Sequence, residues 1–404
     1  MHLPSDGDHT GRDLGAEELE LVRRALESGT LTSTKGTLVT QLEQEFAARY
    51  GAKYAYACTS GSAAVHIAVA AMPLEPGDEV ITTPITDMGA LTCILYQGAV
   101  PVFCDVDPDS YNVTAETIAA RITDRTRAVI VTHLFGSPCD MGPILELCAR
   151  HGLPVIEDCA QSFDATWDGR PVGTMGSVGC FSFQQGKHMT TGEGGIVITD
   201  DEAIARHMFL FINKAWGYGD AKPDHYFMAP NYRMNEITGA VAVAQLHKLG
   251  SVVERRRGSA ARLTAAIADL PGITPQPTVD GATHVYWKYC VNVDAKAAGA
   301  TLEEVAGHLR ENGIFAAPRY VGKPAFECQV FKEKRTFGNS QWPYSDASRA
   351  GLPDVDHDRA NFPGSVKALS QILVIPWNEF YTDEHVDMIS QRLHEVVGQK
   401  EGQR

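Results

Sequence analysis

Between residues 40 and 200, short apolar stretches alternate with amphipathic ones, and this alternation restricts the chain to one class of fold. The apolar stretches have the length of buried strands, and they lie at Tyr54–Cys58, Glu79–Thr82, Val100–Cys104, Ala128–Thr132, Pro154–Glu157, Gly179–Phe183 and Gly195–Thr199. Helical patterns lie between several of them, for example at Ile144–His151. Apolar strands that alternate with helices predict an α/β protein with a mostly parallel, seven-stranded sheet between layers of helices.

The remaining residues predict a second, smaller α+β unit. A long helical pattern runs from Asn231 to about Leu263 and leads towards it. Its predicted elements are a strand at His284–Asp294, a helix at Leu302–Asn312, a strand at Ile372–Pro376 and a helix at Glu384–Val397. Because 404 residues are too many for one simple core, we expect a large domain over residues 1–250 and a small domain over residues 251–404.

The charge of the chain excludes several classes of partner. A net charge of −15 argues against nucleic acid or an anionic membrane, since both require a basic surface. The N-terminus has no basic stretch followed by an apolar one, and no apolar run approaches the roughly 20 residues that span a bilayer. We therefore expect a cytoplasmic protein.

The cysteines indicate packing rather than chemistry. There are nine, an odd number, and none forms a CxxC pair, which is typical of small core residues in a reducing compartment. Cys159 is interpreted as a packed residue and not as a nucleophile or metal ligand. We predict no metal site.

An acid and a lysine follow two of the predicted strands. Asp158 ends one strand, and Lys187 comes shortly after another. Ligands bind at the carboxyl ends of strands in open α/β sheets. A lysine amine can form a Schiff base with the aldehyde of pyridoxal phosphate, and an acid can keep the pyridine nitrogen protonated. The pair alone is a weak signal, but Gln161, Ser182 and a Gly-Glu-Gly-Gly turn accompany it.

The turn Ser60-Gly61-Ser62 joins the strand YAYAC to the apolar helix AAVHIAVAA. Exposed amides at a helix N-terminus form a ready anion site, suited to the cofactor phosphate. An ordinary helix cap is the alternative, because serine is a good N-cap residue in any protein.

The stretches VIEDCAQSF and GCFSFQQGKHMTTGEGG resemble the DegT/DnrJ/EryC1/StrS family of sugar and cyclitol aminotransferases, which have the aspartate aminotransferase fold type I. The resemblance extends from LGAEELELVRRALESG to LVIPW. It implies that Lys187 holds the cofactor, Asp158 pairs with the pyridine nitrogen and Gln161 contacts the phenolic oxygen. It further assigns the phosphate to Ser60, Gly61, Ser62 and Ser182.

The resemblance also implies a homodimer. Asn231-Tyr232-Arg233-Met234 matches a family motif whose asparagine reaches the cofactor phosphate of the neighbouring subunit. Each active site would then be built from two chains. Asn231 could also cap a helix.

The chain departs from the family pattern at Asp87, where an aromatic ring usually covers the cofactor. Met88 is predicted to cover the ring instead, since a thioether packs well on aromatic faces. Asp87 would then face the substrate amine or hydroxyls.

The residue after Lys187 bears on the reaction class, because related dehydratases have a histidine in place of the lysine. The spacing Phe181-Ser182-Phe183-x-x-x-Lys187 places the lysine, and not His188, at the catalytic position. We predict further substrate contacts from polar and aromatic residues, with simple packing as the alternative, at His188, Lys214, Tyr286, Arg319 and Tyr320, among neighbours that include His284, Trp287 and Lys288.

The predicted function is transfer of an amino group from L-glutamine or L-glutamate to the ketone of a cyclitol or sugar, in the biosynthesis of antibiotic-type aminocyclitols or aminosugars. The motif QQGKHMTTGEGG resembles scyllo-inosose aminotransferases and aminohydroxybenzoate synthases more than nucleotide-sugar enzymes, many of which have FYPTK. Three alternatives stay open: a nucleotide-diphospho-keto-sugar aminotransferase, a dehydratase-aromatase, and a non-catalytic regulator that retains the cofactor.

Overall fold

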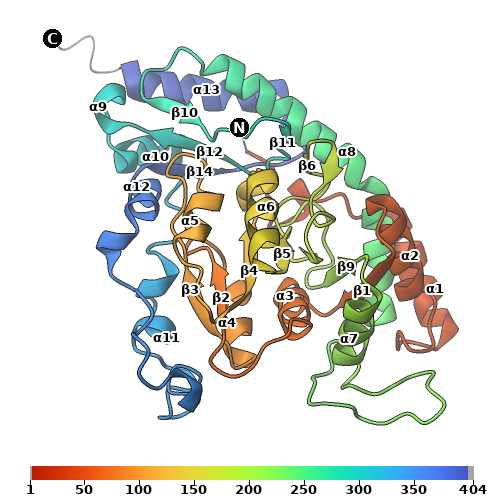
Figure 1. Ribbon diagram of the computed structural model, residues 1–404. Coiled ribbons are helices and arrows are strands. Elements are labelled where there is room, and N and C mark those ends of the chain that lie inside the picture. Colours follow the sequence, from red (N-terminus) through yellow and green to blue (C-terminus); the bar gives the residue numbers. More distant parts are fainter. Residues whose placement is uncertain (1, 399–404) are drawn as a thin grey trace.

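The structure, a computed structural model that describes residues 2–398, is built on a seven-stranded sheet (Figure 1). The strand order is β1-β9-β8-β5-β4-β2-β3, with β1 at Tyr54–Cys58, β2 at Glu79–Thr82, β3 at Val100–Phe103, β4 at Thr126–Thr132, β5 at Val155–Asp158, β8 at Val178–Ser182 and β9 at Gly195–Thr199. Only β9 is antiparallel to its two neighbours, and the other pairs are parallel. The predicted mostly parallel sheet is confirmed, and each strand lies within two residues of its predicted bounds.

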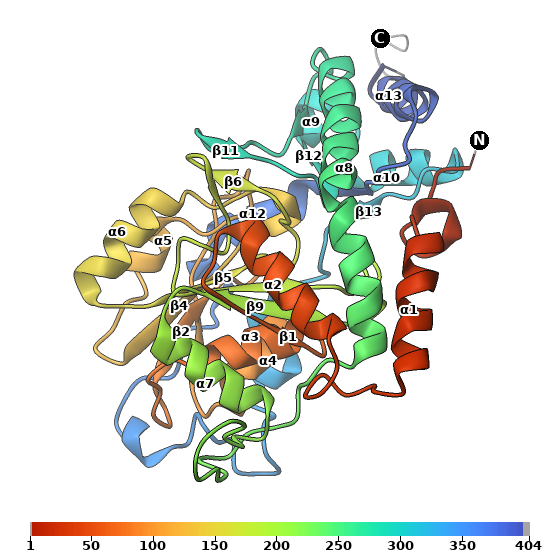
Figure 2. The same cartoon turned by 90° about the vertical axis from the view of Figure 1, so that its right-hand side faces the viewer.

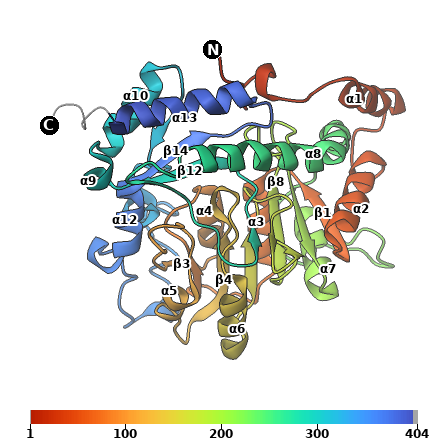
Figure 3. The same ribbon diagram turned by 90° about the horizontal axis from the view of Figure 1, so that it is seen from above.

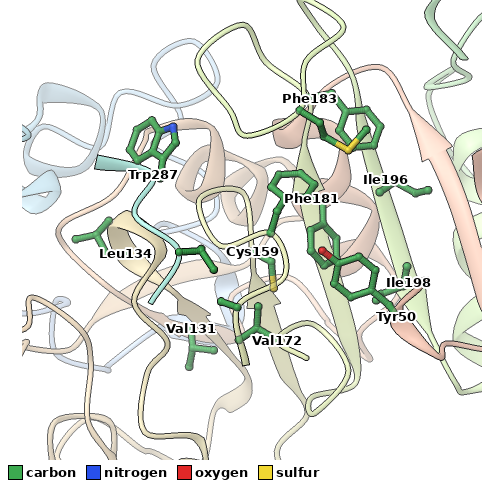
Figure 4. Close-up of a cluster of buried hydrophobic side chains, with 14 of the residues drawn as sticks. Tyr50, Val131, Leu134, Cys159, Val172, Phe181, Phe183, Ile196, Ile198 and Trp287 are labelled. Carbon is green, nitrogen blue, oxygen red and sulfur yellow. The ribbon is translucent and has the colours of Figure 1, made fainter. Parts of the chain in front are cut away.

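Helices cover both faces of this sheet (Figure 2). On one face lie α3 (Gly61–Ala70), α4 (Gly89–Tyr96) and α7 (Glu202–Ile212), and on the other lie α2 (Leu38–Tyr50), α5 (Ala115–Ala119) and α6 (Met141–His151). Successive side chains of a strand point to opposite faces. Phe181, Ile196 and Ile198 therefore pack into the core on the α2 and α6 side (Figure 4), whereas Cys180 and Val197 pack under α3.

The helix α8 (Glu236–Ala266) connects the large sheet to the C-terminal residues and passes over the sheet (Figure 3). Its N-cap is Asn235, whose Oδ1 accepts a hydrogen bond from Thr238 N at 2.9 Å. The prediction that this helix starts at Asn231 was wrong, because Asn231 precedes the cap and lies outside the helix. The helix α1 (Ala16–Ser28) packs along α8 (Figure 2).

A second sheet has the order β10-β12-β14-β13, with β10 at Ile273–Pro275, β12 at Lys288–Val293, β13 at Ala317–Pro318 and β14 at Ile372–Pro376. Beside it lie α9 (Ala295–Ala298), α10 (Leu302–Glu311), α12 (Pro363–Gln371) and α13 (Asp383–Gly398). The predicted strand from His284 begins only at Lys288, because Tyr286 has a φ of 51° and interrupts the extended backbone. The predicted domain division at residue 250 falls inside α8 and stays a prediction.

The remaining elements are short. The strands β6 (Thr166–Trp167), β7 (Arg170–Pro171) and β11 (Ala282–Thr283) form a small third sheet, and α11 (Gln329–Lys332) lies between β13 and α12 in the chain. Within residues 2–398, no helix has both the length and the apolar character needed to cross a membrane.

Candidate active site

A cavity of about 400 Å³ lies at the carboxyl ends of β5 and β8. Asp158 is the last residue of β5 and Ser182 the last of β8, while the turn after β1 supplies the start of α3. Eight of the predicted site residues line this cavity: Ser60, Gly61, Ser62, Asp87, Asp158, Ser182, Lys187 and Tyr320. The sheet thus brings together groups that are far apart in the sequence.

Lys187 lies in the loop between β8 and β9 and extends into the cavity. Its Nζ is 4.2 Å from the centre of the Trp287 ring. Burial lowers the pKa of the Lys187 amine to about 8, and the charge of Lys288 acts in the same direction, whereas Asp158 opposes the shift. The lowered pKa favours the neutral amine, which is the nucleophilic form.

Asp158 is buried at the floor of the cavity. Its Oδ1 accepts a hydrogen bond from Ala160 N at 3.1 Å, and no residue in the described part of the chain donates to Oδ2. Burial raises the pKa of the Asp158 carboxyl, while the Ala160 N–H and the charge of Lys187 oppose the shift. A cationic nitrogen in the cavity would pair with Oδ2 of Asp158 and keep the carboxylate ionised.

The turn after β1 forms an anion cradle. Ser60 caps α3 through its Oγ, which accepts from Ala63 N at 3.0 Å, so the capping alternative also holds. The amides of Gly61 and Ser62 donate to no other group within the described residues. A Cβ on Gly61 would lie 2.5 Å from the Cβ of Ser182, and glycine therefore allows this close approach.

These three features fit pyridoxal phosphate. The amides at the start of α3 can bind the phosphate, Oδ2 of Asp158 can pair with the ring nitrogen, and Nζ of Lys187 can hold the aldehyde carbon. Gln161 lies beside the cavity, because its Nε2 donates to the hydroxyl of Tyr320 at 3.3 Å and its Oε1 accepts from Phe135 N at 2.7 Å. The individual residue roles stay predictions.

A second cavity, of about 580 Å³, adjoins the first, since Asp87 and Tyr320 line both. The Oδ1 of Asp87 accepts a hydrogen bond from Gly89 N at 2.8 Å. Met88 lines only the second cavity and packs against the cluster that contains Phe103. Met88 is not in the lining of the first cavity, and its role as a cover of the cofactor stays a prediction.

Two aromatic rings reach the first cavity instead. Trp287 and Tyr320 both line it and meet edge to face, with ring centres 5.9 Å apart. Trp287, labelled in Figure 4, also stacks parallel to Phe135, with ring centres 6.3 Å apart. From the sequence, Trp287 was named only as a neighbour of the predicted substrate contacts, and not as a residue of the cofactor cavity.

The structure of a single chain does not bring the other predicted substrate residues to the cavity. His188 is buried, and its Nε2 lies 2.9 Å from the carbonyl of Val285, so a substrate contact does not fit its position. Arg319 pairs with Glu303 at 2.7 Å. Tyr286 stacks on His284 with ring centres 4.0 Å apart, and Lys214 and Asn231 are exposed.

Sequence reasoning missed several residues that line the cavity. Ala160 and Glu193 both do so, and their positions inside the stretches DCAQ and TGEGG were the only signal. Arg12 was missed as well, although its guanidinium donates to the carbonyl oxygen of Lys187 at 2.8 Å. No local sequence pattern predicts a hydrogen bond between residues that are so far apart in the chain.

A buried polar cluster lies beside Asp158. His133 Nε2 is 3.1 Å from Glu157 Oε2, and His133 Nδ1 accepts from Cys139 N at 3.0 Å. Glu157 also accepts hydrogen bonds from three backbone amides, so these polar groups satisfy one another. Cys159 lies close to them, among the apolar side chains of Figure 4, and burial raises the pKa of its thiol. The absence of a metal stays a prediction.

The fold and this cavity define a pyridoxal-phosphate-dependent aminotransferase. The chain belongs to the DegT/DnrJ/EryC1/StrS aminotransferase family, whose model matches residues 12–352. The spore coat polysaccharide biosynthesis protein SpsC of Bacillus subtilis (strain 168) is 32% identical over 394 residues, which cover 95% of each chain. The GDP-perosamine synthase of Caulobacter vibrioides is 33% identical over 370 residues, covering 89% of this chain and 96% of the relative.

A solved structure extends the comparison to three dimensions. The crystal structure of 3-amino-5-hydroxybenzoic acid synthase superposes with a TM-score of 0.85 at 27% identity, and the match covers 96% of this chain and 98% of the other. The predicted fold, cofactor and enzyme class are therefore confirmed.

Proposed function

We propose that the protein transfers an amino group from L-glutamine or L-glutamate to the ketone of a cyclitol or sugar. The observation that carries this proposal is the cavity in which Lys187, Asp158 and the start of α3 face a common space. Family membership supports the sugar class. We further propose that the protein acts in the cytoplasm, in the biosynthesis of an aminocyclitol or aminosugar.

Pyridoxal phosphate, when bound, supplies an aldehyde carbon that carries the amino group and a ring that accepts electrons. Lys187 would anchor it through Nζ, and whenever this amine is free, its pKa of about 8 lets it take up and release a proton near neutral pH. Asp158 holds a proton on the ring nitrogen through its charge. The amides of Gly61 and Ser62 orient the cofactor by its phosphate.

The motif around Lys187 favours a keto-cyclitol as acceptor, whereas two observations favour a nucleotide-linked keto-sugar. The first is the similarity to GDP-perosamine synthases. The second is the cavity of about 580 Å³ beside the cofactor cavity, which offers room beyond a single sugar ring and has Lys323 in its lining. A lysine there could pair with a diphosphate.

The test is a panel of acceptors with purified holoenzyme and glutamine or glutamate as donor, read by mass spectrometry of the aminated product. The panel contains scyllo-inosose, a free keto-sugar and a GDP-linked keto-sugar. Lys187→Ala serves as the inactive control, and Lys323→Ala separates the two candidates because it should raise KM only for a diphosphate substrate. Release of water without consumption of the amino donor would instead indicate a dehydratase, and inactivity towards all acceptors would argue for a regulator.

We also propose a homodimer with shared active sites. Asn231 is exposed and pairs through its backbone with Asn213, on a surface that also carries Arg233. Within one chain, Asn231 lies outside both cavities described above. Its predicted contact with the cofactor phosphate therefore requires a second chain.

A further inference from the structure

The loop that carries Lys187 is held by side chains from distant parts of the chain. Three consecutive carbonyl oxygens are bound: that of Gln185 by Arg12, that of Gly186 by Trp287 Nε1 at 2.6 Å, and that of Lys187 by Arg12 at 2.8 Å. A single guanidinium thus binds the residues on both sides of Gly186. The planar guanidinium of Arg12 presents its N–H donors as a rigid fork, and their fixed directions allow it to bind two carbonyl oxygens at once.

The N-terminal segment positions Arg12 in turn. Arg12 Nε donates to the carbonyl oxygen of Asp6 at 3.0 Å, and Gln185 Nε2 donates to the same oxygen at 2.9 Å. The backbone of Asp6 therefore contacts both Arg12 and the lysine loop. Both Arg12 and the side chain of Asp6 are largely removed from solvent.

The carboxylate of Asp6 fixes this segment to the rest of the molecule. It pairs with Arg256 of α8 at 3.1 Å and with Lys288 at the start of β12 at 3.2 Å, and it accepts from Asn378 at 2.6 Å. Burial alone would raise the pKa of Asp6, but Arg256, Lys288 and Arg12 together lower it. One buried carboxylate thus joins the N-terminus, the long helix and the second sheet.

We propose that residues 3–12 form an N-terminal strap in which Arg12 and Asp6 are positioning residues for Lys187. The strap holds the lysine loop in the geometry that captures the cofactor, and it links this geometry to the placement of the second sheet. Asp6 precedes the residues that match the family model, which begins at Arg12. The inference rests on the proposed role of Lys187.

The first measurement follows the rate at which pyridoxal 5′-phosphate binds covalently to apo protein, by absorbance after mixing. Arg12→Ala should slow this rate roughly tenfold or more, since two charge-assisted hydrogen bonds to the loop are lost. Arg12→Lys keeps the charge but not the fork, and it should recover only a minor part of the rate. Arg23→Ala is the matched control, because Arg23 is exposed on α1 and its ion pairs within residues 2–398 are with Glu20 and Glu27.

The second measurement needs no cofactor. Hydrogen exchange of the peptide over residues 183–192 should become roughly tenfold faster in Arg12→Ala and Asp6→Asn apo protein, and remain unchanged in Arg23→Ala. Thermal unfolding and circular dichroism establish that each variant is folded at the assay temperature. For Asp6→Asn, a variant that does not fold is replaced by Asp6→Glu, for which the same acceleration is expected.

The outcomes separate the strap from the role of Lys187. Wild-type capture and exchange in folded Arg12→Ala, with only a lower melting temperature, would show a purely structural role and overturn the inference. Full capture in Arg12→Lys would overturn the positioning role of the fork. Wild-type covalent capture in Lys187→Ala would instead refute the proposed function of that residue and leave the exchange result to decide on the strap.

Discussion

Asp158 has one oxygen engaged by a backbone amide and the other directed to no described donor, which makes its charge available to a ligand. Replacing it with asparagine keeps the shape but removes the charge that would hold a proton on the cofactor ring. We expect turnover to fall on the order of a thousandfold, about 4 kcal/mol of transition-state stabilisation. Steady-state kinetics of the folded, cofactor-loaded variant provide the measurement.

The matched control for this prediction is Asp140→Asn, an exposed aspartate at the start of α6. It should leave turnover within about twofold of wild type, because surface substitutions rarely affect chemistry or stability. Turnover near the wild-type value in Asp158→Asn would contradict the assigned role.

The lowered pKa of Lys187 predicts the pH dependence of cofactor capture. Only the neutral amine attacks an aldehyde, and at pH 7.5 a lysine with a pKa of about 8 is neutral in about a quarter of the molecules. An unperturbed lysine would be neutral in about one in a thousand. We expect the capture rate of the apo protein to rise up to about pH 8 and then level off, as measured by stopped-flow absorbance.

The same cofactor mixed with N-acetyl-lysine corrects for ionisation of the cofactor itself. Since burial is the main cause of the shift, a partly unfolded sample should behave like the free amine. A rate that continues to rise to pH 10 in folded protein would show that Lys187 has an ordinary pKa.

At the scale of single elements, Gly61 at the start of α3 joins the cradle to the strand β8. A methyl group on Gly61 would lie 2.5 Å from the Cβ of Ser182, so α3 or β8 must shift. We expect Gly61→Ala to lower the cofactor affinity roughly tenfold and to cost about 1–3 kcal/mol of unfolding free energy. Titration of apo protein with the cofactor and thermal unfolding measure the two effects.

Gly258→Ala is a control for which we expect the opposite change in stability. It lies on the exposed side of α8, and an added Cβ would meet nothing within 4 Å. Alanine is a better helix former than glycine, so Gly258→Ala should stabilise the protein by up to about 1 kcal/mol without changing cofactor affinity. Equal affinities in Gly61→Ala and wild type would mean that the cradle tolerates the shift.

Elements with a strong local signal could be predicted, and those that depend on distant contacts could not. Strands β2 and β9 are buried on both faces, so their apolar runs mark their ends well. The start of α8 was misplaced because Asn231 and Asn235 are both plausible caps, and only the hydrogen bond of Asn235 decides between them. The interruption at Tyr286 depends on a left-handed backbone that tyrosine rarely adopts.

The candidate site shows the same division. Asp158 and Ser182 end strands and Lys187 follows one, so all three could be placed from the alternating pattern and the family motif. Met88 lines the second cavity, whereas its neighbour Asp87 lines both, and the sequence pattern does not distinguish these two positions. Arg12 and Asp6 reach the site only through tertiary contacts, which a polar N-terminal stretch does not reveal.

At the scale of the whole molecule, a shared active site predicts that two inactive variants complement each other. Mixing Lys187→Ala with Asn231→Ala chains under conditions of subunit exchange produces dimers with one site that carries both defects and one that carries neither. Random exchange of equal amounts should then restore about a quarter of wild-type activity. Native mass spectrometry of differently tagged chains verifies the exchange.

Each variant alone, subjected to the same exchange conditions, provides the baseline. If mixed dimers form without any gain in turnover, then Asn231 acts within its own chain or is dispensable. Asn231→Ala with full activity would likewise contradict the sharing.

Eight of the nine cysteines are buried, and Cys328 is the exception. It lines the cavity of about 580 Å³ beside the cofactor site, so the chain contains its own reporter of that space. A maleimide should modify this thiol first, because burial withholds the others from reagents. A substrate that extends into the second cavity should slow the modification several-fold, as followed by mass spectrometry, whereas a small acceptor confined beside Lys187 should leave it unchanged. The modification rate of Cys328 would thus show whether the natural substrate extends into the second cavity, even before that substrate is identified.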